Sequence, residues 1–141
     1  MKIIGFRINK IECKKNSEKV QDLKINSSID ILSIKEINLD SITTSNQMVS
    51  IEFKHTLEYS PEYAKMELQG DMIIEEQPKT LKKIMEQWKD KKLPAEFKVN
   101  LFNWIIRKTT IKMLELEEDL NLPPHINFPL LKIIQEKDKK E

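Results

Sequence analysis

The sequence predicts an α+β domain: a four-stranded antiparallel sheet with a long helix and shorter helices packed on one face. Residues 49–59 alternate strictly between apolar and polar side chains, which is typical of an antiparallel strand with one buried face. A helical pattern runs from about Phe97 to Leu120 with apolar residues three or four positions apart. The strand-like segments all precede the helical ones, which favours α+β over an alternating α/β order.

Length and composition indicate a single soluble domain over residues 1–136 and a short charged tail over 137–141, within 141 residues. The net charge of +1 and the presence of two arginines, Arg7 and Arg107, argue against a nucleic-acid partner. A single cysteine, Cys13, excludes an internal disulfide framework and a cysteine-based zinc site. No apolar run reaches the roughly 18–20 residues of a transmembrane helix, and the apolar start is too short for a signal sequence. We therefore expect a cytoplasmic protein without membrane insertion.

The first two strands are predicted from about Lys2 to Cys13 and from about Ile25 to Ile37. In the first strand the apolar residues change parity after Ile8, which indicates a bulge or a strand buried on both faces. The connection over 14–24 is polar, and its only large apolar residues are Val20 and Leu23.

The next two strands are predicted to form a hairpin. The strand over 49–59 follows a turn at residues 43–46, and Ser60-Pro61-Glu62 turns the chain into a return strand over about 64–74. Gly70 within the return strand predicts a bulge or a close backbone approach.

Two helices follow, and the second carries apolar residues on two sides. Pro78 opens the first helix, which is expected to end at Leu93-Pro94. The long helix has one broad apolar face, and Trp104, Ile111 and Phe97 project roughly opposite to it. Two apolar faces need two partners, so Trp104 and Ile111 are predicted to lie in an oligomer interface. The alternative is that the short helix covers Trp104.

The sequence offers little that would support catalysis, a metal or a cofactor. The chain has two glycines, so it lacks the glycine-rich phosphate loops. His55 lies at an apolar position of a strand and is interpreted as a core or interface histidine. His125 has no acidic pattern beside it that makes a metal site. The acidic run at 115–119 lies at a helix C-terminus, where a basic group is expected to compensate it. We therefore predict a protein that is not an enzyme.

The stretch from Asn121 to Leu131 is apolar although it is not helical. Pro123 and Pro124 predict the end of the long helix, and Pro129 opens a further short helix to about Glu136. Several apolar side chains lie on the stretch: Leu122, Ile126, Phe128, Leu130 and Leu131. Two interpretations stay open, a lid over the domain's own core or one wall of an apolar groove for another molecule.

In element order and in this loop the chain resembles the SecB export chaperones and the SecB-like chaperones. The family's loop has Leu-Asn-Leu-Ala-Pro, then Val-Asn-Phe and an apolar helix. This chain has residues 120–124 as Leu-Asn-Leu-Pro-Pro, one extra residue at His125, and then Ile126-Asn127-Phe128. Residues 67–70, Glu-Leu-Gln-Gly, are similar to the family's Glu-Val-Gln-Gln-Gly strand, and Arg7-Ile8 to its Arg-Ile.

The resemblance implies a chaperone that holds unfolded polypeptides and assembles as a tetramer, a dimer of dimers, through long helices and sheet edges. Carried over by position, the implied client-binding residues lie on two loops: Val20, Leu23, Leu122, Ile126, Phe128 and Leu131. A chaperone for many sequences needs apolar, loop-borne surface rather than fixed polar pockets.

The chain departs from the family in its charge. The family is acidic and docks the SecA motor through carboxylates, whereas here Glu12 and Glu67 are surrounded by lysines and the tail is short. Client holding is implied, but SecA coupling is not. The alternatives are a SecB-like chaperone dedicated to one partner, as in toxin–antitoxin systems, or a plain oligomeric interaction domain.

Overall fold

The computed structural model describes residues 1–16, 21–37 and 47–134. Its four strands are β1 (Lys2–Lys15), β2 (Lys24–Ile37), β3 (Gln47–Ser60) and β4 (Ala64–Glu76), followed by helices α1 (Pro78–Trp88) and α2 (Ala95–Asp119). The strands form one antiparallel sheet in the order β1-β4-β3-β2. The α+β prediction and the hairpin of β3 and β4 are confirmed.

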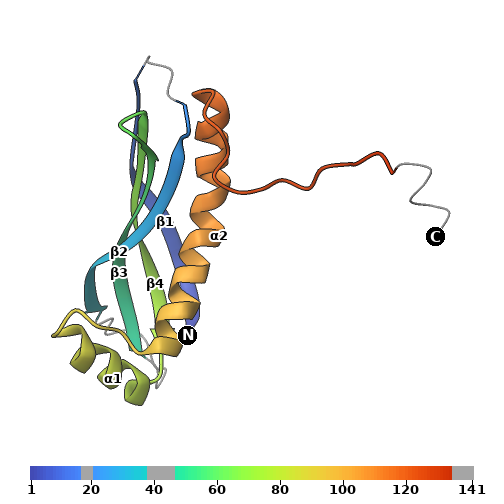
Figure 1. The fold of residues 1–141 in the computed structure, drawn as a ribbon. Coiled ribbons are helices and arrows are strands. Elements are labelled where there is room, and N and C mark those ends of the chain that lie inside the picture. The colour runs from blue at the N-terminus through green and yellow to red at the C-terminus, as the bar shows by residue number, and fades with distance from the viewer. Residues whose placement is uncertain (17–20, 38–46, 135–141) are drawn as a thin grey trace.

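One face of the twisted sheet is covered by α2, which runs along its length, while α1 lies at one end (Figure 1). Strict alternation in β3 and β4 places one set of side chains beneath α2. Phe53 and Met66 belong to this set, and both are fully buried as the sequence predicts. The opposite face of the sheet is polar and solvent-facing.

Irregularities in β1 adapt this strand to its neighbour. The register against β4 shifts between Ile3 and Gly5 and again between Ile8 and Lys10, which confirms the predicted bulge. Gly70 lies opposite the second shift, and a Cβ built there would lie 2.2 Å from the carbonyl oxygen of Arg7. The predicted close backbone approach is therefore the reason for this glycine.

Helix α2 is buried along a single stripe in which every fourth residue points to the sheet: Phe97, Leu101, Ile105, Thr109, Met113 and Glu117. A spacing of four residues advances by about 40° per step around a helix of 3.6 residues per turn. The buried stripe therefore winds around α2 as the helix crosses the twisted sheet. Phe97 is one end of this stripe, and the prediction that it lies on the opposite face is wrong for that reason.

Two predicted helical segments differ in the structure. Helix α1 ends at Trp88 rather than at Leu93, and the chain turns through Lys91, whose φ of 59° lies in the left-handed region. The helix predicted from Pro129 does not form over 129–134, which is an extended segment leading away from the body (Figure 1). Its apolar side chains find no surface of this chain to pack on, and a short helix without packing is marginal in water.

The predicted turn at 43–46, the charged tail at 137–141 and Val20 lie outside the described residues.

Candidate functional site

The loop that follows α2 begins with a well-formed C-cap. Asn121 adopts a left-handed backbone with a φ of 54°. The amide of Leu122 donates to the carbonyl of Glu117 at 2.8 Å, and the amide of Asn121 to that of Glu118 at 3.3 Å. This is the Schellman arrangement, in which a residue that tolerates positive φ ends the helix. Asn121 therefore stops α2 before Pro123 is reached, and the two prolines only prevent its continuation.

Buried polar contacts then fix the loop to the body of the protein. The hydroxyl of Tyr59 lies 2.6 Å from Oε2 of Glu117 and 2.9 Å from the carbonyl oxygen of Pro123. Nδ1 of His125 lies 2.5 Å from the other oxygen of Glu117, Oε1. Burial raises the pKa of Tyr59, and the bond to the Glu117 carboxylate raises it further, so the phenol stays protonated. One carboxylate thus connects α2, β3 and the loop.

A lysine compensates the C-terminal end of α2, as the acidic run predicts. Nζ of Lys15, at the end of β1, donates to the carbonyl of Leu120 at 2.7 Å. This contact places a positive charge on the negative end of the helix dipole. It also shows that the end of β1 and the loop after α2 lie side by side, at the end of the molecule where β2 begins (Figure 1).

The structure separates the predicted binding residues of this loop into two groups. Leu122 is only 6% exposed and belongs to the core beneath α2, so its prediction as client-binding surface is wrong for the folded chain. The cause is the C-cap, because the residue after a left-handed Asn returns against the last helical turn. Ile126 and Phe128 are 39% and 52% exposed, and Leu131 is fully exposed. Leu23, just before β2, is half-buried.

The two open interpretations of this loop therefore each describe part of it. Up to His125 the loop covers the core, and from Ile126 onward it presents apolar side chains to solvent. The first part of the loop is fixed to the core, and the part that follows exposes apolar side chains. Such a surface can bind apolar segments of another polypeptide, but it lacks the placed polar groups that a polar ligand needs.

The predicted interface residues on α2 are also unequal. Trp104 is half-buried and packs against the chain's own first core cluster, whereas Ile111 is 70% exposed. Val99 and Ile106 are further exposed apolar residues of α2. Exposed apolar side chains therefore lie on two sides of this helix, with Val99 and Ile106 on one and Ile111, the more exposed of the two predicted interface residues, about 140° around from Ile106.

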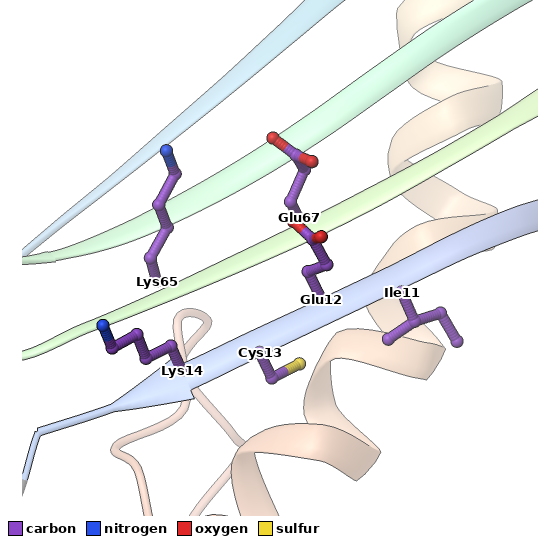
Figure 2. Close-up of a pocket in the computed structure, with 6 residues that line it drawn as sticks. All are labelled: Ile11, Glu12, Cys13, Lys14, Lys65 and Glu67. Carbon is purple, nitrogen blue, oxygen red and sulfur yellow. The ribbon is translucent and has the colours of Figure 1, made fainter.

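A cavity of about 530 Å³ lies at the free edge of β1 and holds none of the predicted site residues. Figure 2 shows Ile11 and Cys13 on the helix-bearing side of the strand and the carboxylates of Glu12 and Glu67 on the other. Because its lining residues face both sides, the cavity is the open edge of the sheet. Partial burial raises the pKa of Cys13, which keeps the thiol protonated and disfavours its use as a nucleophile.

His55 is a buried histidine with both ring nitrogens paired, as the sequence predicts for a core position. Thr109 Oγ1 donates to the carbonyl of Ile105 at 2.8 Å, so it accepts from Nδ1 of His55 at 2.7 Å. Nε2 then accepts from the hydroxyl of Ser27 at 2.7 Å. Burial, reinforced by the charge of His125, lowers the pKa of His55 to about 4, so the ring is neutral at pH 7.

Within the described residues, no cluster of three or more His, Cys, Asp or Glu side chains is placed to hold a metal ion. Neither described helix has the length and apolarity needed to cross a bilayer.

The network of Tyr59, Glu117 and His125 is the part of the site that sequence reasoning missed. Its only sequence signals are a glutamate at a buried position of α2 and a histidine just after the prolines. Neither signal identifies a partner, because the three residues come together only when β3, α2 and the loop are packed.

Comparison with solved structures relates this fold to that of a SecB-like chaperone. The Mycobacterium tuberculosis SecB-like chaperone, solved in complex with a ChAD peptide from the HigA1 antitoxin, superposes with a TM-score of 0.51. The match covers 94% of this chain and 92% of that chain at 14% sequence identity. The chain therefore has the SecB-like fold. No protein-family profile matches the sequence, and no curated protein is similar to it in sequence.

Proposed function

We propose that this protein is a SecB-like chaperone that holds non-native polypeptide segments on the apolar surface after α2. The observation that carries the proposal is the exposure of Ile126 and Phe128 immediately after a loop anchored by Leu122 and Glu117. Anchoring matters because side chains on a rigid base stay exposed instead of folding back onto the core. Leu131, Leu23 and Val20 are proposed to extend this surface.

The chemistry of the surface supports a polypeptide client rather than a small molecule. Exposed apolar side chains contact many sequences with little angular specificity, which is what a holding chaperone requires. The structural neighbour of this chain carries an antitoxin peptide, and this supports a polypeptide ligand for the shared fold. We infer that the protein is not an enzyme and uses no cofactor.

A chaperone dedicated to one partner is the second candidate. It is favoured by the neighbour, whose bound peptide comes from a single antitoxin. A general holder and a dedicated one differ in promiscuity, so the two are separated by offering several unrelated unfolded proteins. Suppression of aggregation for all of them supports a general holder, and suppression for a single partner supports a dedicated one.

Assembly is proposed to be a homotetramer, a dimer of dimers. Two features support self-association: the exposed Ile111 on the outside of α2, and the unpaired edge of β1, which pairs only with β4 in the described sheet. Another chain could pair with the free backbone groups of the strand edge and cover the exposed apolar side chain of the helix, and both contacts would stabilise an oligomer. A plain oligomeric interaction domain shares this assembly but lacks client holding.

Coupling to a SecA-type motor is not part of the proposal. Glu12 lies 3.5 Å from Nζ of Lys10, while Glu67 lies 3.8 Å from Lys10 and 3.9 Å from Lys54. Carboxylates neutralised by neighbouring lysines present a weaker target to a basic partner. We propose that the protein is cytoplasmic and has no nucleic-acid partner. Its proposed role in protein transport is to keep polypeptides unfolded, without docking to a motor.

The proposal is tested by adding purified protein to a chemically unfolded client and following light scattering on dilution of the denaturant. We expect scattering to fall as the protein approaches equimolar amounts, and a fluorescent label on Asn127→Cys, in a Cys13→Ser background, to report client contact. Undiminished aggregation for every unrelated client tried, with the protein itself folded, would overturn the proposal of a general holder.

A further inference from the structure

A cleft of about 550 Å³ lies where the end of α1, the start of α2 and the edge strand β2 meet. It is lined from β2 by residues 29–31, from the end of α1 by Trp88, and from α2 by Phe102. The proposed client-binding loop, residues 121–128, follows the other end of α2. A helix of 25 residues is about 37 Å long, so the two surfaces are well separated.

The floor of this cleft is apolar. Five side chains line it, all partly buried and all packed on the first core cluster: Ile29, Ile31, Trp88, Leu93 and Phe102. Because each packs on the core with one side and faces the cleft with the other, the floor is held in place. It offers two aromatic rings and three aliphatic groups to a ligand.

The rim of the cleft is basic. Lys91, Lys92 and Lys98 line it, against one carboxylate, that of Asp30. Nζ of Lys91 lies 4.5 Å from the centroid of the Trp88 ring, and Nζ of Lys98 lies 5.5 Å from that of Phe102. These cation–π contacts hold the ammonium groups above the floor. Among the described residues the ion pairs involve none of these three lysines, so their charges are available.

The cleft also reaches the open edge of β2. Ile29 and Ile31 point to the helix-bearing face, while Asp30 between them points to the other face, and all three line the cleft. In the described sheet β2 pairs only with β3, so its outer backbone groups have no strand partner there. An extended polypeptide fits such an edge through main-chain hydrogen bonds, with side chains in the adjoining cleft.

We propose that this cleft binds an acidic segment of a partner polypeptide, with large apolar side chains on the floor and flanking carboxylates against Lys91, Lys92 and Lys98. Charge complementarity identifies the partner chemistry, because an apolar floor alone accepts any apolar chain whereas three lysines around it select for Asp and Glu. The site goes beyond the client-holding loop and does not depend on it.

The test is fluorescence anisotropy with a labelled peptide whose leucine and phenylalanine core is flanked by glutamates. Its matched counterpart carries lysine at each glutamate position. We expect saturable binding of the acidic peptide, weakening with added salt, and binding of the basic peptide at least about tenfold weaker. The variant K91E/K98E should lose the acidic peptide and favour the basic one. The control K79E/K82E makes the same charge change at exposed positions of α1 outside the cleft, and should bind like the wild type.

Three results would overturn the proposal: equal affinity for both peptides, unchanged affinity in K91E/K98E, or a lower oligomeric mass of K91E/K98E in light scattering, which would mean that a second copy occupies the cleft. Circular dichroism confirms that each variant is folded. The loop variant I126S/F128S separates the two proposals. It should bind the acidic peptide normally, and a loss of that binding would place the peptide on the loop and reject the cleft.

Discussion

Nδ1 of His125 lies 2.5 Å from Oε1 of Glu117, and both side chains are almost fully buried. The histidine belongs to the loop and the glutamate to α2, so this single contact ties the base of the proposed client surface to the core. The second oxygen of Glu117 lies 2.6 Å from the hydroxyl of Tyr59 on β3.

Replacing Glu117 with Ala is expected to destabilise the protein. The change leaves the buried ring nitrogen of His125 without its partner, which costs about 1–3 kcal/mol, and the Tyr59 hydroxyl keeps the carbonyl of Pro123 but loses a hydrogen bond worth about 1 kcal/mol. We expect the free energy of unfolding in urea to fall by about 2–4 kcal/mol. The neighbouring exposed residue supplies the control, since Glu118→Ala should change the free energy by no more than about 0.5 kcal/mol. Equal effects of the two substitutions would show that the network does not fix the loop.

The lowered pKa of His55 predicts that the free energy of unfolding decreases in mild acid. Its pKa is lowered to about 4 in the folded protein, whereas an unfolded histidine titrates near 6.5. Between these values the unfolded state binds the extra proton, so the stability is fully present above about pH 6.5 and decreases as the pH falls toward 4. The contribution of one such group is at most about 1.4 kcal/mol per pH unit. Urea titrations between pH 7 and pH 4 measure it, and in His55→Asn this decrease should be smaller. An identical pH dependence in the variant would reject the assignment to His55.

The two glycines should respond differently to alanine. A Cβ at Gly70 would lie 2.2 Å from the carbonyl oxygen of Arg7 and 3.0 Å from the ring of Phe53, so the β1–β4 backbone must separate. We expect Gly70→Ala to cost about 1–3 kcal/mol, in the range of overpacked sites. At Gly5 nothing lies within 4 Å of the added atom, and Gly5→Ala should be close to neutral. Thermal unfolding of both variants makes the comparison.

Ile111→Glu is expected to lower the oligomeric state without destabilising the fold. The side chain is 70% exposed in the single chain, so a charge there costs little unless another subunit covers it. Ile106→Glu is the control, at an exposed apolar position about 140° around the same helix. Light scattering coupled to size-exclusion chromatography reports the mass. A wild-type monomer at micromolar concentration would reject self-association altogether.

The sequence predicted the strands well because their alternation is a local property. Residues 49–59 alternate because one face of this strand is buried under α2 and the other faces solvent, and this pattern can be recognised without knowing the neighbouring strands. The stripe on α2 was harder to predict, since a projection at 100° per residue assumes a straight contact. The contact from Phe97 to Glu117 instead winds with the twist of the sheet, and no local pattern reveals that twist.

The candidate site was predicted only in part for a related reason. The prolines indicate that the chain leaves the helix, but the fate of each apolar side chain depends on the C-cap. Asn121 adopts the left-handed conformation, and this turns Leu122 inward. The partners of Glu117 come from β3 and from beyond the prolines, so its role depends on long-range packing. The segment over 129–134 lacks a packing surface in this chain, and its helical pattern alone did not produce a helix.

The double variant I126S/F128S shows whether the loop after α2 holds clients. Both side chains are substantially exposed, so their replacement should hardly change the melting temperature, while suppression of client aggregation should fall strongly. Melting curves and client light scattering on the same sample measure both quantities. A loss of about 3–5 kcal/mol of folding stability, with client holding reduced only in proportion, would contradict the account. That result would show that Ile126 and Phe128 belong to the core and that the client surface lies elsewhere.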